Sequence, residues 1–327
     1  MTRPGEFEVI RKYFAPLAQS LPGALDLTDD AAILNVPKGR ELVVTSDALV
    51  SGVHFLADDP PADIAAKALR VNVSDLASMG AEPLAYTLAV AFSDNVDEDW
   101  LRAFAGGLER DQIEFGIALI GGDTVATPGP LTLSICAFGS VPKGLALRRG
   151  GAQPGDSLFV SGTIGDATLG LAVLTGELDG VDTAFQDELV GRYRRPTPRR
   201  ALGIELIGLA TSAIDVSDGL VADLGHICDV SGVGATIDAG RVPLSAAARA
   251  VLDARRTGIE RLLCGGDDYE LLFSAPANNR EKVARVAAQA EVEVSEIGRI
   301  GESKGEVCVV GEDGRSIEIG DAGFTHF

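Results

Sequence analysis

The stretch Ser212-Ala213-Ile214-Asp215-Val216-Ser217-Asp218-Gly219-Leu220 decides the fold class. Its first part reads as a short strand, Ser212–Val216, and the residues from Asp218 to Val230 read as a helix. A strand that leads into a helix is the unit from which α/β proteins are built. Strands and helices alternate in the same way along the 327 residues, so the sequence predicts an α/β or α+β fold.

Hydrophobic periodicity predicts the remaining elements. Helices are expected at Glu6–Ala18, from Pro60-Pro61 to Met79, at Glu98–Glu114 and at Asp166–Leu174. Strands are expected at Ala31–Val36, Leu42–Thr45, Leu84–Phe92, Ile117–Ile120, Leu131–Val141, Ser157–Ser161 and Tyr269–Phe273. The turn-rich run Gly150–Asp156 predicts a boundary between an N-terminal domain, 1–149, and a C-terminal domain, 150–327.

Composition limits the classes of function. The net charge of −20 argues against binding nucleic acid, whose backbone is recognised by clustered Lys and Arg. No apolar run approaches the roughly 20 residues of a membrane span, and the charged N-terminus is not a signal peptide, so we expect a cytoplasmic protein. The four cysteines lie far apart and form no CxxC pair, which predicts free thiols: Cys136, Cys228, Cys264 and Cys308.

Six acidic landmarks punctuate the chain, several of them directly after an apolar run. They are Asp29-Asp30, Thr45-Ser46-Asp47, Asn72-Val73-Ser74-Asp75, Gly121-Gly122-Asp123-Thr124, Asp215-Val216-Ser217-Asp218-Gly219 and Gly265-Gly266-Asp267-Asp268. A single Asp after a strand is usually a helix cap or a turn residue, but six landmarks are hard to explain in that way. Clustered carboxylates need protons or hard cations, and Mg²⁺ prefers such oxygen ligands together with substrate phosphates.

Other features leave more than one interpretation open. The glycine pairs before Asp123 and Asp267 let the backbone approach a ligand, although neither the Walker nor the GxGxxG pattern is present. Arg148-Arg149 suits a phosphate contact and equally a solvated surface pair. A lone His, such as His54 in Gly52-Val53-His54-Phe55, is more often a structural than a catalytic residue.

In order along the chain, these motifs resemble those of the thiamine-monophosphate kinase family, which belongs to the superfamily of aminoimidazole ribotide synthetase. The resemblance covers essentially the whole chain. The segments that carry it, besides the six landmarks, are Gly5-Glu6-Phe7, Gly52-Val53-His54-Phe55, the run Lys67–Ala81, Gly265-Gly266-Asp267-Asp268-Tyr269-Glu270-Leu271 and Gly323-Phe324-Thr325-His326-Phe327.

This resemblance implies a two-domain aminoimidazole ribotide synthetase-like fold with mixed sheets covered by helices. The N-terminal domain would carry the metal and ATP site and much of a homodimer interface, and the C-terminal domain would complete the active site. The implied reaction converts ATP and thiamine monophosphate to ADP and thiamine diphosphate, with several Mg²⁺ ions as cofactors. No nucleic acid or membrane partner is implied.

The resemblance also implies roles for single residues. Metal positions would be Asp30, Thr45, Ser46, Asp47, Asp75, Asp123, Asp215 and Asp218. ATP contacts would be Gly122, Asp123, Arg149 and Ser217, and contacts to the thiamine substrate His54, Asp267 and Phe324. Three positions depart from the family pattern: Thr28 replaces a Gly, Asp267 replaces a common Glu, and Phe324 lacks the hydroxyl of a Tyr variant.

The chemistry of the acceptor explains why such a site is rich in Asp and poor in His and Lys. A phosphomonoester loses its second proton at a pKa of about 6, so the attacking oxygen is already ionised near neutral pH. Charge neutralisation is then the main requirement of phosphoryl transfer. We therefore expect direct in-line transfer, with no catalytic side chain and no phosphoenzyme.

Several relatives and one other class compete with this interpretation. Selenophosphate synthetase needs a reactive residue near the N-terminus, whereas the first cysteine here is Cys136. The hydrogenase-maturation relative carries a Cys near its C-terminal end, whereas this chain ends in His326-Phe327. Aminoimidazole ribotide synthetase lacks the Gly-Asp-Asp-Tyr-Glu-Leu segment. A nucleotide-binding scaffold without activity would have no need for so many uncompensated carboxylates.

Overall fold

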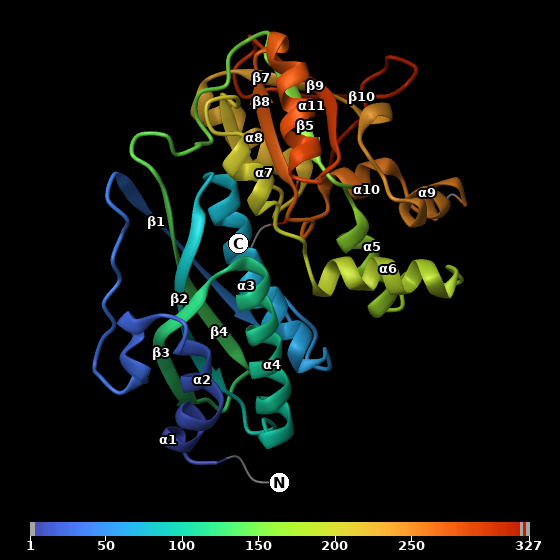
Figure 1. Cartoon of the computed structure of the whole chain (residues 1–327). Coiled ribbons are helices and arrows are strands. Elements are labelled where there is room, and N and C mark those ends of the chain that lie inside the picture. Colours follow the sequence, from blue (N-terminus) through green and yellow to red (C-terminus); the bar gives the residue numbers. More distant parts are fainter. Residues whose placement is uncertain (1–3, 255, 321–322, 325–327) are drawn as a thin grey trace. The chain divides into compact units, whose positions relative to one another are not determined.

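The computed structural model of the chain describes residues 4–254, 256–320 and 323–324, and Figure 1 shows its helices and strands. The segment Thr325–Phe327, which contributed to the family resemblance, lies outside the described residues. The chain forms two compact units. One runs up to Leu76 and includes Ala81–Gly144, and the other combines Ala77–Gly80 with the residues from Leu145 onward. Within the described ranges, no helix has the length and apolar character that a membrane crossing requires.

The first unit is built on a four-stranded sheet with the order β1-β4-β2-β3. Its strands are β1 (Arg40–Val50), β2 (Glu82–Phe92), β3 (Ala118–Ala126) and β4 (Thr132–Pro142). β4 pairs antiparallel with both β1 and β2, while β2 and β3 run parallel. The strands β1 and β3, which carry two of the six acidic landmarks, therefore form the two edges of this sheet.

Two long helices, α3 (Pro61–Ser78) and α4 (Glu98–Phe115), pack against this sheet and against each other (Figure 1). Gly107 of α4 allows this close approach, because a Cβ there would lie 2.5 Å from the carbonyl oxygen of Ala62 on α3. The side-chain amide of Gln112 on α4 donates to the hydroxyl of buried Tyr86 on β2. The α4 helix begins where Asp97 accepts from the backbone N–H of Trp100 and ends at left-handed Gly116.

The N-terminal segment forms one continuous helical stretch, as expected, although it includes a π-helical turn: α1 (Glu6–Val9), η1 (Ile10–Phe14) and α2 (Ala15–Ala18). A 3-10 segment, η2 (Pro22–Leu27), follows. The strand expected at Ala31–Val36 was wrong. These residues join no sheet of the described structure, and a hydrogen bond from the N–H of Ile33 to the carbonyl of Gly23 ties them to the η2 segment instead.

The second unit contains a six-stranded mixed sheet with the order β10-β7-β9-β5-β8-β6. Its strands are β5 (Ser157–Ser161), β6 (Ser212–Asp215), β7 (Gly234–Asp238), β8 (Leu271–Ala275), β9 (Val294–Gly301) and β10 (Val307–Val310). Its helices are α5 (Asp166–Leu174), α6 (Thr183–Arg194), α7 (Arg200–Glu205), α8 (Leu220–Ser231), α9 (Ala246–Asp253), α10 (Ile259–Cys264) and α11 (Arg280–Gln289), with short 3-10 turns η3 (Ala239–Arg241) and η4 (Ala277–Asn279).

Helices cover both faces of this second sheet. Leu158 and Val160 of β5 belong to one hydrophobic cluster, together with residues of α8 such as Leu224. Phe159, between them, belongs to another cluster that contains Leu202 of α7 and Val286 of α11. Because successive side chains of a strand point to opposite faces, the two clusters lie on opposite sides of the sheet. The expected class, α/β with mixed sheets covered by helices, is confirmed.

Two boundaries differ from the sequence prediction in a way that affects the site. β3 does not end at Ile120 but continues to Ala126, so Asp123 lies inside an edge strand and not after it. β8 begins at Leu271 and not at Tyr269, because Asp267 and Tyr269 have positive φ angles of 70° and 51°, which no strand accommodates. The four cysteines are free thiols, as predicted.

Candidate active site

The loop between β6 and α8 is held by a single buried carboxylate, that of Asp223. Asp215 ends β6 with 3% of its surface exposed, and α8 begins at Leu220. One oxygen of Asp223, in the first turn of α8, accepts from the backbone N–H groups of Ser217, Asp218 and Gly219 at 3.0, 3.0 and 3.2 Å. These three hydrogen bonds therefore fix the backbone of the polar loop between β6 and α8.

Asp223 also has an unusual protonation equilibrium. Burial raises its pKa to about 7, with a further contribution from the negative charge of Asp218. The three backbone hydrogen bonds act in the opposite direction. Ligand atoms of Asp218, Asp223 and His226 lie within 4.8 Å of one another. The junction thus concentrates negative charge that a cation would neutralise.

Three chain segments meet at this junction. The backbone N–H of Asp267 donates to the carbonyl of Ser217 at 2.8 Å, and that of Phe324 donates to the carbonyl of Asp218 at 3.0 Å. Gly266 permits the contact, because a Cβ there would lie 2.3 Å from the Ser217 oxygen. The structure therefore brings together five of the predicted site residues: Asp215, Ser217, Asp218, Asp267 and Phe324.

Arg149 is not part of this group. It is exposed, and its carbonyl accepts from the hydroxyl of Ser231 at the opposite end of α8. That helix has 12 residues, which corresponds to about 18 Å at about 1.5 Å per residue.

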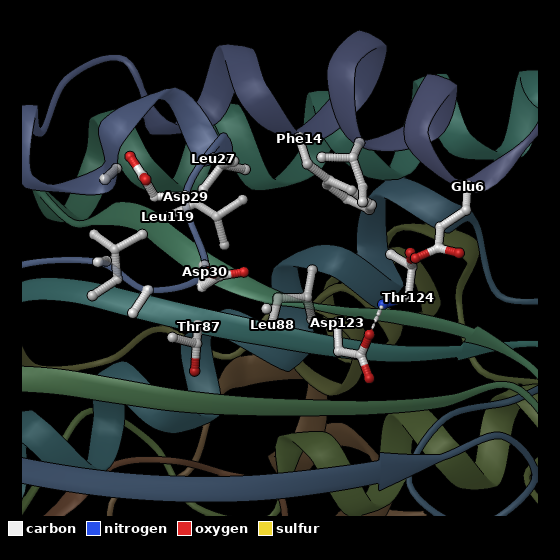
Figure 2. A pocket seen from close by; sticks show the side chains of 17 residues that line it. Glu6, Phe14, Leu27, Asp29, Asp30, Thr87, Leu88, Leu119, Asp123 and Thr124 are labelled. Atoms are coloured by element: carbon white, nitrogen blue, oxygen red, sulfur yellow. Dashed lines mark hydrogen bonds between the residues drawn. The ribbon is translucent and has the colours of Figure 1, made fainter.

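In the first unit, a cavity of about 480 Å³ collects a second group of predicted residues. Asp30, Gly122 and Asp123 line it, together with Asp29 and residues of the N-terminal helices (Figure 2). Gly122 allows β2 and β3 to pair here, since a Cβ would lie 1.9 Å from the carbonyl oxygen of Leu88. Asp123 is exposed and accepts from the N–H of Thr124 at 2.9 Å.

A third group forms between β1 and α3. The Thr45 hydroxyl donates to the carboxylate of Asp75, and Asp47 lies beside them. Burial raises the pKa of Asp47 to about 7, followed in importance by the charge of Asp75 and a side-chain hydrogen bond with it. Ser46, the intervening residue, is exposed and donates to the carbonyl of Ile135.

His54 occupies the turn after β1, where its Nδ1 accepts from the N–H of Val50 at 3.0 Å. This hydrogen bond closes the turn through Nδ1, the ring nitrogen nearer to the backbone, and does not involve Nε2.

The second and third groups occupy opposite parts of the sheet. β4 and β2 separate β1 from β3, so three strand spacings of about 4.8 Å place Asp47 about 14 Å from the β3 backbone. A row of paired residues runs from Asp47 across the sheet to Gly122. Because neighbouring residues alternate between faces, Asp123 projects from the face opposite to Asp47.

Comparison with known proteins identifies the family. Residues 28–141 match the N-terminal domain of AIR synthase related proteins, and residues 153–311 match the C-terminal domain. The thiamine-monophosphate kinase of Escherichia coli K12 is 42% identical over 324 residues, which cover 99% of this chain and 98% of the relative. This chain belongs to the thiamine-monophosphate kinase family.

Solved structures of family members agree with this assignment. A thiamine-monophosphate kinase from Stenotrophomonas maltophilia K279a has 44% identity and a TM-score of 0.81, with 89% of this chain and 91% of that chain covered. A structure of AaThiL complexed with AMPPCP and TMP has 30% identity and a TM-score of 0.78, with 99% and 97% covered. Both the recognition of the family and the expectation of an enzyme are confirmed.

The sequence prediction missed two features of this family member. Asp223, which fixes the site loop, was hidden because an acid in the first turn of a helix is a common capping feature. Glu270, which is fully buried three residues after Asp267, was read only as part of a motif. The signal that could have found it is a Glu inside an otherwise apolar strand start, since an unpaired carboxylate is almost never fully buried.

Proposed function

We propose that this chain catalyses ATP-dependent phosphorylation of thiamine monophosphate to thiamine diphosphate. The observation that carries the proposal is the near-full-length similarity to AaThiL, which was solved with AMPPCP and TMP bound. The three carboxylate groups at the β6–α8 junction, the β3 cavity and the β1–α3 contact supply the chemistry that two phosphate-bearing substrates require. We propose the cytoplasm as its location, because Mg²⁺ and ATP are supplied there.

The residues present are suited to Mg²⁺. The pKa of Asp47 is raised by burial and by Asp75, which indicates a carboxylate pair with a deficit of positive charge. Hard divalent cations bind such oxygen ligands, and a hydroxyl such as that of Thr45 can join them. We propose that the eight metal positions named above hold several Mg²⁺ ions. When bound, these ions would neutralise the phosphate charges of both substrates.

The chain's own residues would bind and orient the substrates. Gly122 brings backbone close to a ligand in the β3 cavity, which supports its proposed contact with ATP together with Asp123. Ser217 and Arg149 are proposed ATP contacts of the second unit. Asp267, Phe324 and His54 are the proposed contacts of the thiamine moiety, since a carboxylate stabilises the fixed cation of the thiazolium ring.

No side chain needs to remove a proton in this reaction. The acceptor phosphate is ionised near neutral pH, so a site that neutralises charge and aligns the reactants is sufficient. We propose direct in-line transfer of the γ-phosphoryl group. Trapping of a phosphorylated enzyme after incubation with radiolabelled ATP would contradict this part of the proposal.

We also propose a homodimer formed through the face of the four-stranded sheet opposite to α3 and α4, where the N-terminal segment leaves part of the surface exposed. Leu42 and Val44 of β1 and Val125 of β3 share that face and are 43%, 53% and 51% exposed. Apolar residues exposed along two edge strands favour burial against another chain. Ser46 and Asp123 project from the same face, so a second copy there would enclose two proposed metal positions.

Steady-state kinetics with alternative acceptors tests the proposed function. We expect turnover of thiamine monophosphate to exceed that of unphosphorylated thiamine by at least about a hundredfold in kcat/KM, because only the phosphate offers oxygens for bridging by metal ions. Equal or better turnover of thiamine would reject the proposal. Turnover that persists in excess EDTA would reject the magnesium component alone.

A further inference from the structure

The backbone that carries Asp267 is strained. Asp267 and Tyr269 have φ angles of 70° and 51°, in the left-handed region that residues other than glycine seldom adopt. This backbone conformation is costly for a residue with a Cβ, so it persists only where the surroundings enforce it. The backbone N–H of Asp267 donates to the carbonyl of Ser217, and that of Tyr269 donates to the carbonyl of Val216, both at 2.8 Å. These hydrogen bonds tie the segment to the β6–α8 junction.

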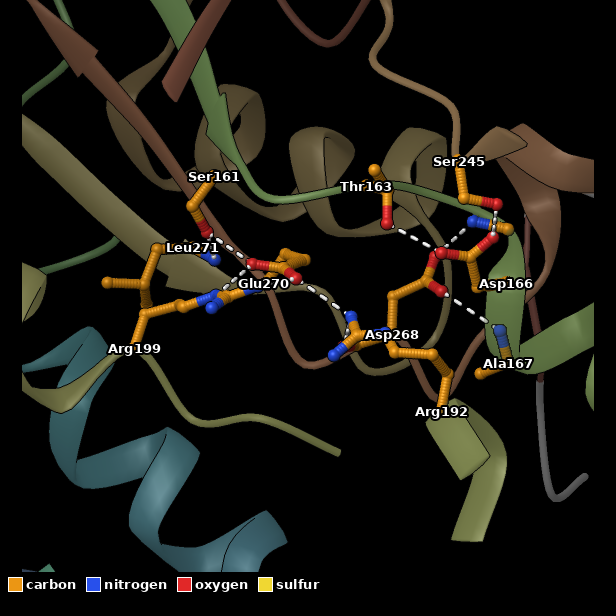
Figure 3. A network of polar contacts seen from close by, with 11 residues as sticks. Ser161, Thr163, Asp166, Ala167, Arg192, Arg199, Ser245, Asp268, Glu270 and Leu271 are labelled. Atoms are coloured by element: carbon orange, nitrogen blue, oxygen red, sulfur yellow. Dashed lines mark hydrogen bonds and ion pairs between the residues drawn. The ribbon is translucent and has the colours of Figure 1, made fainter. Parts of the chain in front are cut away.

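The side chain of Glu270, the residue after Tyr269, accepts four hydrogen bonds (Figure 3). The Glu270 side chain is 0% exposed. Arg199 donates to both of its oxygens at 2.6 and 2.5 Å, Arg192 donates to Oε1 at 2.8 Å, and Ser161 donates to Oε2 at 2.6 Å. Glu270 therefore cannot rotate without leaving charged groups of two arginines unpaired.

Asp268 provides a second anchor in the same segment. Its carboxylate is buried and accepts from the N–H groups of Gly165 and Ala167, at 2.7 and 3.4 Å, where α5 begins. Arg192 connects the two anchors, because it also donates to the carbonyl of Asp268 at 3.3 Å. With Asp268 and Glu270 fixed, the backbone between them has to pass through the strained angle at Tyr269.

Fold stability alone does not account for this arrangement. A buried Arg–Glu–Arg triad recovers little net stability, because the desolvation of its charges offsets their attraction. Burial opposes the charge of Arg199, and the hydrogen bond and charge of Glu270 overcome that effect and raise its pKa. In some proteins buried ionic groups fix a single conformation, and the four hydrogen bonds of Glu270 restrict its own segment in this way.

We propose that Glu270, held by Arg192 and Arg199, is a positioning residue that sets the affinity for the phosphate acceptor by fixing Asp267. This inference rests on the proposed function, in which Asp267 contacts the thiazolium cation of the acceptor. Glu270 itself acts through the backbone of its own segment and touches no reactant. The acceptor affinity and not the ATP affinity should therefore depend on the triad.

The variant Glu270→Gln tests this inference, because glutamine keeps the shape but not the charge. We expect the KM for thiamine monophosphate to rise by about tenfold and the KM for ATP to change by less than about twofold. The matched control is Glu296→Gln. Glu296 on β9 also lies between two arginines, Arg280 and Arg241, but holds no part of the Asp267 segment. We expect both KM values of this control to stay within about twofold of wild type.

Hydrogen exchange measured by mass spectrometry provides a readout that does not depend on activity. In Glu270→Gln, we expect faster exchange confined to the segment 265–270, in which the N–H groups of Asp267 and Tyr269 bond to the carbonyls of Ser217 and Val216 in the wild type. If Glu270→Gln fails to fold, Arg192→Lys takes its place, since lysine cannot bridge two acceptors as the guanidinium does.

The outcomes separate this inference from the proposed function. Unchanged exchange in the segment, or a parallel rise of both KM values, would overturn the positioning role. A wild-type protein without activity on thiamine monophosphate would reject the proposed function, and the exchange experiment would then decide alone whether the triad anchors the segment.

Discussion

At the scale of single residues, the site depends on carboxylates placed in conformations and protonation states that are costly elsewhere. Asp267 has a φ of 70°, a region in which Asp and Asn are tolerated better than longer side chains. This geometry gives a physical reason for an Asp, and not a longer acidic side chain, at this position. It also means that Asp267→Asn changes the charge with little change in backbone preference.

We predict that Asp267→Asn raises the KM for thiamine monophosphate by about tenfold and leaves the KM for ATP within about twofold of the wild type. The reason is that only the acceptor carries the thiazolium cation. Varying each substrate in turn measures the two constants. A rise confined to the KM for ATP would show that Asp267 belongs to the nucleotide site.

Asp223 gives a prediction about pH. Its folded pKa of about 7 lies above the unfolded value of 3.8, so the unfolded chain releases this proton first. The free energy of unfolding therefore falls as pH rises from about 4 to about 7, by up to about 4 kcal/mol for a shift of about three units.

Asp223→Asn can keep an oxygen acceptor for the three backbone N–H groups but has no carboxyl proton to lose. In the presence of EDTA, we expect its stability to fall less than that of the wild type between pH 5 and pH 8. Urea unfolding at both pH values measures the difference. Identical pH dependence in the two proteins would show that Asp223 has an ordinary pKa.

At the scale of elements, the sequence predicted the first part of β3 but not its continuation. Its apolar start, Ile117–Ile120, was recognised because a buried run stands out by composition. Its continuation through Gly121–Ala126 was not recognised, because glycines and an Asp resemble a turn when pairing partners are unknown. Pairing with β2 keeps this part extended, and only the register could show that.

The two glycines of β3 therefore differ in their tolerance. A Cβ at Gly122 would lie 1.9 Å from the Leu88 carbonyl oxygen, whereas a Cβ at Gly121 would meet only Thr87, at 3.8 Å. We predict that Gly122→Ala lowers the free energy of unfolding by at least about 2 kcal/mol, whereas Gly121→Ala changes it by less than about 1 kcal/mol. Equal effects of the two substitutions on urea unfolding would contradict this account of the β2–β3 pairing.

At the scale of the whole molecule, the sequence could supply candidate site residues but not their grouping in space. Asp215 and Asp218 adjoin in the chain, so their proximity was predictable. The approach of Asp267 and Phe324 to the same junction depends on backbone bonds across long sequence separations, which no local pattern encodes. The same holds for the separation of Asp47 from Asp123, which follows from the strand order of the first sheet.

The proposed homodimer predicts a result for one surface substitution. Val44→Asp places a charge on the exposed part of the face of the first sheet opposite to α3 and α4, so we expect it to reduce the mass in solution from twice 33.9 kDa to the mass of one chain, 33.9 kDa. Ile113→Asp, at a residue 79% exposed on α4, is the control and should remain dimeric. Light scattering after size exclusion measures both, and a monomeric wild type would refute the dimer.

The central claim is transfer of one phosphoryl group from ATP to the phosphate of thiamine monophosphate. The most direct measurement is ³¹P NMR of the purified chain with ATP, Mg²⁺ and thiamine monophosphate. The account predicts that ADP and thiamine diphosphate appear in equal amounts as both substrates disappear. It also predicts that neither product signal appears with Asp75→Asn. Release of inorganic phosphate from ATP without any thiamine diphosphate would contradict it.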